Sequence, residues 1–591
     1  FYKNDQDSSN LQSLYEKAID QSNFEAIVSI HEQTQIIIAD TPTPASDSDA
    51  EQMATAIQLR DKIETDLAIF MQTQLESVLQ GASLSKEDSD KLSLCMTIVG
   101  DNSLEKFDVV LRDYLLGDIA ESEYIHFLET LYPVSGLQRF LNEQVEKFYT
   151  IKEFRAELEP ACQLMQQADY GGSVSALDNL SNSEYARIRA LNRILQNLKK
   201  ESLDHLYAQR MPEIQLLIDQ GRLYDASLII DSIIHYYPNN SELKQAKTYT
   251  DKIVPRNVDY WNGSIDAISV KPLIADPERA FDEDAFAEKA NKDLLTAEEF
   301  RLFLEALYKN NYVLINGNEI VDAEGQYQQI LVPANKKPLL LFLDEFYFTP
   351  QRVESGICKR LDLDADANVL SVVQDRQGRE QVKSDTTAID VLENFLLDYP
   401  DFNFNGAKAV IVLSGIDGLF GYPLNEENLI HMRTQANTIG LNNYTDSIED
   451  TAANKKKLKE IIEVLQKRQW IFASQSYSRL SVPDQSLSSL SRDTDRMDKE
   501  IGEIIGDMKI FSFAGGNHTE SNPLLAGYLA NAGYVLQTGS GTTYAYTVQK
   551  SGYVYLDKHQ ITAEKLRDPF SHALDNFVTS EKIIIESKRP Y

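Results

Sequence analysis

The spacing of apolar residues changes near Pro255, and this change constrains the fold of the 591-residue chain more than any other feature. From Ser9 to about Lys252, apolar residues recur every three or four positions, which is the period of an α-helix. After Pro255, short β-branched and aromatic runs alternate with helical stretches. The chain is therefore predicted to contain two domains, residues 1–252 and 258–591, and the second is expected to fold alone.

The first 252 residues are predicted to form an all-α, partly repeat-like domain. Ile214–Ile218 and Tyr224–Ile233, separated by Gln220–Arg222, indicate two short amphipathic helices joined by a tight turn, similar to a tetratricopeptide hairpin. A weaker version of this phrase lies at Ala18–Ala26, but no regular period of about 34 residues links the two. A peptide-binding repeat array and an irregular helical bundle without a binding role are both open.

The second domain is predicted to be a (β/α) barrel. Strands that alternate with helices imply a parallel sheet, here closed into about seven strands. Thr296 and Glu299 form a capping-box pattern at the start of one of its helices. Active sites of such barrels lie at the carboxyl ends of the strands. The predicted strands are Ile265–Val270, Tyr312–Ile315, Leu339–Leu343, Ala409–Leu413, Trp470–Ser474, Ile510–Phe513 and Tyr553–Leu556.

Composition excludes several classes of protein. With 57 Lys and Arg against 91 Asp and Glu, the net charge is −34, which repels a phosphate backbone, so no nucleic-acid partner is expected. A hydrophobic content of 42% indicates a globular chain. The longest apolar run, Pro338–Leu343, is only strand length, so no membrane span is predicted. Because the chain begins at Phe1 without Met, an upstream signal peptide or membrane anchor is expected.

Two strand ends with polar or charged residues are the candidate sites of chemistry. The strand Leu339–Leu343 ends in the acidic pair Asp344 and Glu345, and a later predicted strand runs into Gln475–Arg479. Together with these strand ends, further phrases make residues 258–591 resemble the polysaccharide deacetylase (NodB-type) family, in a Gram-positive surface-protein branch. These phrases are Leu273–Pro277, Lys336–Leu339, Pro400–Phe402, Gly406–Lys408 and Arg492–Arg496.

The resemblance implies a site whose metal ligands have been lost. In the family, the first Asp of the pair is the general base, while the second Asp and two His, four residues apart, hold a divalent metal that activates water. Here Asp344 matches the base and Glu345 replaces the ligand Asp, while Gln475 and Arg479 stand at the two His positions. An amide is a poor zinc ligand, and a guanidinium is none.

Further positions depart from the family pattern. An Arg that orients the catalytic carboxylate in the family is absent from Phe511–Gly516. His431 and His518 are alternative ligands, but their spacing is more typical of surface histidines. One face of the tyrosine series at 544, 546, 553 and 555 is a candidate sugar-stacking platform. The remaining expected pocket residues are Phe513, Trp470, Tyr347 and His559.

The leading hypothesis is an extracellular or cell-surface protein, anchored through a preceding segment, whose catalytically inactive barrel binds cell-wall or exopolysaccharide glycan or acts as a scaffold. One alternative is an active carbohydrate deacetylase that uses zinc or another divalent metal; otherwise no cofactor is expected. Another alternative is an adaptor that binds a protein partner through its helical domain. Since Arg479 adds a permanent cation at a lost ligand position, it is predicted to pair with Asp344 or Glu345 in place of the metal.

Overall fold

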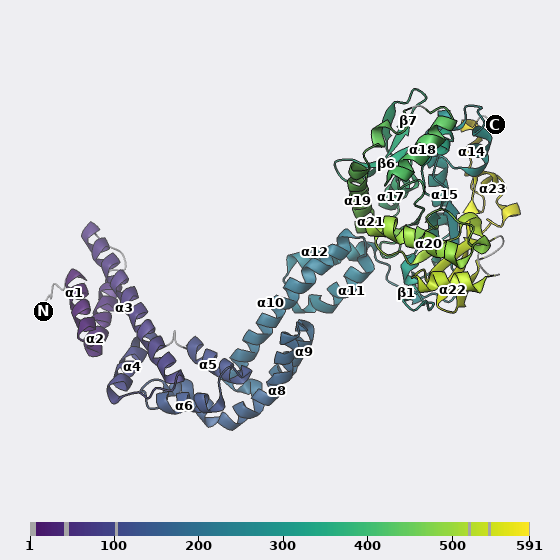
Figure 1. Cartoon of the computed structure of the whole chain (residues 1–591). Coiled ribbons are helices and arrows are strands. Elements are labelled where there is room, and N and C mark those ends of the chain that lie inside the picture. Colours follow the sequence, from purple (N-terminus) through teal and green to yellow (C-terminus); the bar gives the residue numbers. More distant parts are fainter. Residues whose placement is uncertain are drawn as a thin grey trace. The chain divides into compact units, whose positions relative to one another are not determined.

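The computed structural model describes residues 8–40, 46–100, 104–441, 443–517, 522–541 and 545–589. The chain divides into two compact units, residues 1–210 and 211–591. Figure 1 shows helices in the first unit and strands surrounded by helices in the second. Within the described ranges, none of the helices combines the length and the apolar character that crossing a bilayer requires.

The first unit is all-α, as predicted. Its helices share one core of buried aliphatic and aromatic side chains, including Tyr114, Tyr124 and Phe154. Pro160 lies inside α8 and Pro212 inside α10, so neither proline ends its helix. The helices are α1 Ser8–Asp20, α2 Phe24–Asp40, α3 Asp47–Leu79, α4 Lys86–Val99, α5 Leu104–Leu116, α6 Glu121–Leu131, α7 Gln138–Glu146, α8 Phe148–Gln166, α9 Tyr170–Ser181 and α10 Arg189–Asp219, whose last turns belong to the second unit.

The second unit begins with a helical turn that contacts the barrel. α10 ends at Asp219 and α11 (Leu223–Ile233) follows, so the turn lies where the sequence predicts it, although α10 is far longer than expected. A Cβ on Gly406 would lie 2.8 Å from the carbonyl oxygen of Gln220, so the two backbones approach closely. The rings of Tyr224 and Phe404 contact at 5.2 Å. The last turns of α10, together with α11 and α12 (Ser241–Ile253), therefore group with the barrel.

Among the described residues, seven parallel strands close into a barrel in the order β2-β5-β9-β10-β11-β12-β14 and back to β2. The ring strands are β2 Asp266–Val270, β5 Lys337–Leu343, β9 Val410–Leu413, β10 Ile471–Ser474, β11 Ile510–Ser512, β12 Leu536–Ser540 and β14 Tyr553–Ile561. Outside the ring lie β1 Val258–Tyr260, β3 Tyr312–Leu314, β4 Leu331–Pro333, β6 Arg360–Leu363, β7 Val369–Gln374, β8 Glu380–Lys383 and β13 Thr547–Lys550.

The closed barrel is confirmed, but one of its strands differs from the prediction. Tyr312–Leu314 pairs with the first residues of β5, with one further bridge from Leu314 to Asn403, and stays outside the ring. Its expected place is taken by β12, whose sequence Leu-Gln-Thr-Gly-Ser has no β-branched or aromatic run to reveal it. β12 closes the ring because it pairs with both β11 and β14.

Helices cover the outside of the barrel. A capping box at Thr296 and Glu299 starts one of them, as predicted. The second unit's remaining α-helices are α13 Pro277–Ala280, α14 Ala287–Asp293, α15 Ala297–Lys309, α16 Pro350–Glu354, α17 Ala388–Asp398, α18 Glu426–Thr438, α19 Thr451–Lys467, α20 Leu487–Met497, α21 Glu503–Ile505, α22 Pro523–Asn531 and α23 Ala563–Arg567.

A buried ion pair joins the end of the chain to α15. The guanidinium of Arg589 donates to both carboxylate oxygens of Glu299, at 2.8 and 2.5 Å, and to the carbonyl oxygen of Leu294. Burial raises the pKa of Glu299, but the bonds from Arg589 and from backbone N–H groups outweigh burial and hold that pKa below its ordinary value. The last described residues therefore belong to the barrel's outer layer.

The predicted boundary at 252–258 lies on the C-terminal side of the division at 210–211, and fragments test which one marks an independent folding unit. A fragment starting at Met211 should keep its turn contacts with Gly406 and Phe404, so it should melt above one starting at Val258. We expect a difference of about 3 °C or more by calorimetry. Tyr224→Ala should lower the melting temperature of the longer fragment and so remove part of the difference. Equal melting temperatures of the two unmodified fragments would place the boundary near residue 255.

Candidate functional site

The carboxyl end of the barrel holds a buried ion pair between Asp344 and Lys558. Apolar side chains of β5 and β14 that face the barrel interior include Leu340, Phe342 and Leu556. Asp344 and Lys558 follow two residues later on their strands and so lie on the same interior face. Nζ of Lys558 lies 2.8 Å from Oδ2 of Asp344, and Lys558 is fully buried.

Polar neighbours complete this pair. Nζ of Lys558 donates to Oγ of Ser512 at 2.5 Å. Nε2 of Gln475 and Oγ of Ser512 donate to Oδ1 of Asp344 at 3.3 and 3.5 Å. The ammonium also lies 5.1 Å from the ring centre of Phe342. The pair is therefore both charge-balanced and hydrogen-bonded, which a buried ion pair requires.

Glu345 has separate partners. Its backbone φ is +48°, a left-handed conformation. Its carboxylate lies 2.5 Å from Nη2 of Arg352 and 3.9 Å from Nζ of Lys271. Nη1 of Arg352 also donates to the carbonyl oxygen of Glu345 at 2.8 Å. The two acidic residues of the predicted pair are thus neutralised by different cations.

The predicted pairing of Arg479 is wrong. Its guanidinium bonds the carboxylate of Asp417, whose side chain is fully buried, rather than Asp344 or Glu345. The backbone φ of Arg479 is +54°. The guanidinium also lies 4.0 Å from the ring centre of Tyr347, and that of Arg352 lies 3.8 Å from the same ring. The cation that compensates Asp344 is Lys558.

The other predicted pocket residues lie in different places. Tyr347 lies at this end and its ring contacts the guanidinium groups of Arg352 and Arg479. Phe513 is buried in the core outside the ring. Trp470 precedes β10, at the opposite end of the barrel, and donates from Nε1 to Glu393 at 2.9 Å. His559 lies in β14 with its ring 5.9 Å from that of Phe577, and burial lowers its pKa.

Among the described residues, the alternative histidine forms no metal-binding group. Nε2 of His431 lies 3.3 Å from Oδ1 of Asp417, the same carboxylate that binds Arg479. His518 lies outside the described residues. Tyr544 also lies outside them. Tyr555 is buried in the outer core and Tyr553 packs against it, whereas Tyr546 is 44% exposed. The paired tyrosines of β14 thus serve the core.

These donors do not fit a divalent metal. Asp344, the carboxylate of the barrel interior, already binds an ammonium, and Gln475 turns an N–H rather than a lone pair toward it. Within the described ranges, no group of three or more His, Cys, Asp or Glu side chains is placed to hold an ion. Ser512 and Lys558 are close enough for a serine–lysine dyad, but both are fully buried and Asp344 binds the lysine as a cation.

Sequence reasoning missed Lys558, although a signal was present. In Tyr553–Ile561, Val554, Leu556 and Lys558 alternate at strand spacing, so a lysine continues an apolar face. A charge on the buried face of a strand requires a partner of opposite charge. That requirement points to an acid at the end of a neighbouring strand, such as Asp344.

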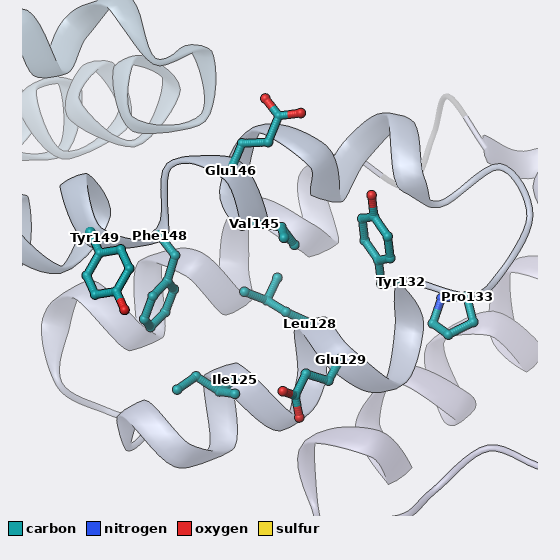
Figure 2. Close-up of a pocket in the computed structure, with 9 residues that line it drawn as sticks. All are labelled: Ile125, Leu128, Glu129, Tyr132, Pro133, Val145, Glu146, Phe148 and Tyr149. Atoms are coloured by element: carbon teal, nitrogen blue, oxygen red, sulfur yellow. The ribbon is translucent and has the colours of Figure 1, made fainter.

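A second candidate site is an apolar groove on the first unit. It has a volume of about 590 Å³ and lies between α6, with the two residues that follow it, and the adjoining ends of α7 and α8. Figure 2 shows Leu128 and Val145 near its centre, with the carboxylates of Glu129 and Glu146 at opposite sides of them. Tyr149, at its end, is 82% exposed. The lining residues are Ile125, Leu128, Glu129, Tyr132, Pro133, Val145, Glu146, Phe148 and Tyr149.

Comparisons with known proteins add little. No family model matches the chain, and no curated protein matches it. Among solved structures, the chain is similar to one titled "Streptococcus pyogenes deacetylase PplD in complex with acetate", at 13% sequence identity. The match covers 51% of this chain and 93% of that chain, with a TM-score of 0.27. A match this distant carries no argument about the site.

The ion pair can be tested by a double-mutant cycle. Lys558→Met leaves the buried Asp344 carboxylate without its cation, so we expect the free energy of unfolding to fall by about 3–5 kcal/mol. Adding Asp344→Asn should restore much of that loss, because the uncompensated charge is removed. Urea unfolding followed by tryptophan fluorescence measures both effects. Lys455→Met on the exposed face of α19 is the control, and equal effects of the two lysine variants would contradict the pairing.

Proposed function

We propose that this protein is a non-catalytic, polysaccharide-deacetylase-like protein that binds glycan or acts as a scaffold at the cell surface. The observation that carries the proposal is the ion pair between Lys558 and Asp344. In the chemistry that the family resemblance implies, the residue at the Asp344 position takes a proton from a metal-bound water. The carboxylate of Asp344 already binds the ammonium of Lys558. It also accepts three further hydrogen bonds, from Gln475, Ser512 and the backbone N–H of Glu345, so its oxygens are already engaged by groups of the protein.

Access to Asp344 favours the same proposal. Asp344 is only 7% exposed, and Lys558 and Ser512 are fully buried. A divalent ion would have to displace the ammonium, and breaking a buried pair costs about 3–5 kcal/mol. The NodB-type assignment, the glycan ligand and the cell-surface location rest on the sequence resemblance and are part of the proposal.

Acetate release tests the loss of catalysis. Protein purified without chelators should release no acetate from N-acetylglucosamine oligomers or peptidoglycan, with or without added zinc or cobalt, and should contain no stoichiometric metal by elemental analysis. An active metal-dependent deacetylase serves as the positive control. Metal-dependent release that Asp344→Asn abolishes would overturn the proposal and favour the alternative of an active deacetylase.

A second candidate function, a protein-binding adaptor, is favoured by the groove on the first unit. Glu129 and Glu146 line it, and neither carboxylate has an ion pair or hydrogen bond among the residues that the structure describes. Val145 and Tyr132 are 41% and 40% exposed there. Apolar anchors between two unpaired acids are complementary to an amphipathic helix with basic residues beside its apolar face. The adaptor function therefore predicts a basic helical segment of a partner protein as the ligand.

A designed peptide tests this groove. A labelled helical peptide with a leucine face flanked by lysines should bind the full chain, and Tyr149→Asp should weaken binding about tenfold by removing an aromatic anchor. Ile69→Asp, at a 58% exposed position of α3, adds the same charge elsewhere and controls for general attraction to an acidic protein. Fluorescence anisotropy measures both. Equal weakening by the two variants would count against the groove.

A further inference from the structure

A cavity of about 560 Å³ lies in the second unit, near the amino end of β9. One wall comes from the end of α10 and from α11 and α12, through Tyr224, Tyr249 and Ile253. The other wall comes from α17 and the segment before β9, including Leu397 and Lys408. The cavity therefore lies away from Asp344, which follows the carboxyl end of its strand.

Several contacts fix the two walls relative to each other. The N–H of Asp225 donates to Oδ1 of Asn405 at 3.3 Å, beside the ring contact of Tyr224 with Phe404. Gly406 has a φ of +78°, and its close approach to Gln220 leaves no room for a side chain. The cavity is thus built by tertiary contacts within one compact unit.

Lys408 places a cation in this cavity without a carboxylate bound to it. Within the part of the chain that the structure describes, its ammonium has no ion pair or hydrogen bond. Glu393, the nearby acid, is held by Arg468 and by Nε1 of Trp470. Burial lowers the pKa of Lys408, Glu393 opposes this effect, and Arg468 adds to it. Asp219, the other acid of the lining, is exposed and accepts a bond from Gln215.

Apolar and amide groups lie around this cation. Tyr249 is 47% exposed and Leu397 is 80% exposed, so the cavity offers an uncovered ring and an aliphatic side chain. Asn405 uses Oδ1 for Asp225, and among the described residues its Nδ2 has no partner. A tyrosine ring can stack on the C–H face of a sugar, while an amide can donate to a hydroxyl group.

We propose that this cavity binds a sugar residue that carries a carboxylate or phosphate group, with the anion on Lys408 and the sugar ring on Tyr249. An ammonium without a partner in a partly buried site gains a charge-assisted hydrogen bond when an anion binds. The inference deepens the proposed glycan-binding role and rests on it for its meaning in the cell. It moves the binding site from the strand ends that carry Asp344 to the opposite end of the barrel.

Calorimetric titration of the full chain tests the site with three probes: a glucuronic-acid disaccharide, glucose 1-phosphate and a neutral N-acetylglucosamine oligomer. We expect binding of at least one anionic probe, weakened at least tenfold by Lys408→Met and severalfold by Tyr249→Ala. The two anionic probes distinguish a carboxylate ligand from a phosphate ligand. Lys455→Met, at an exposed position of α19, should leave binding unchanged.

Amine labelling gives a second readout on the unmodified protein. A limiting amount of an acylating reagent should modify Lys408 more slowly when the anionic probe is saturating, whereas labelling of Lys455 should not change; peptide mass spectrometry measures both. Anionic binding that Lys408→Met leaves intact overturns the site but keeps glycan binding. Binding of the neutral oligomer alone would also overturn the site and keep glycan binding. Failure of all three probes to bind would count against both the site and glycan recognition.

Discussion

The ion pair between Asp344 and Lys558 is the constraint on which the rest of the barrel's carboxyl end depends. Two opposite charges inside a barrel stabilise it only if each keeps its hydrogen bonds, and Ser512 and Gln475 supply them. The other charged groups at this end of the barrel pair separately from Asp344 and Lys558. Glu345 accordingly turns to Arg352, and Arg479 turns to Asp417. Each of the three carboxylates named here therefore has its own cation.

The sequence predicted the closed barrel because most of its strands are runs of buried apolar residues bounded by turns. It failed at β12, where buried polar residues Gln537 and Thr538 hide the strand. It also assigned Arg479 to the wrong partner. Residue spacing predicts the position of a residue along the chain. The left-handed backbone conformation at Glu345 and Arg479 changes the direction of their side chains, which spacing does not predict. A partner choice of this kind depends on tertiary contacts that one sequence does not reveal.

The helical half shows a related limit. Helical periodicity predicted an all-α unit, but not that α8 and α10 would continue through Pro160 and Pro212. The sequence also did not predict the groove, because its apolar residues, such as Leu128 and Val145, come from separate helices. A helical pattern marks an apolar face, and only the packed structure tells whether another helix covers it. Uncovered anchors beside unpaired acids favour a partner-binding role over a purely structural bundle.

The net charge of the chain has opposite effects on ligand binding at the two proposed surfaces. A chain with a net charge of −34 attracts basic segments over long distances and repels anionic glycans. The groove can use that field, since its acids Glu129 and Glu146 have the same sign as the whole chain. An anionic ligand of the Lys408 cavity is repelled by the net negative charge of the chain. At 0.1 M ionic strength, salt screens this repulsion at distances beyond about 10 Å. Recognition of an anionic sugar there must therefore come from short-range contacts, which a partly buried cation and an uncovered aromatic ring provide.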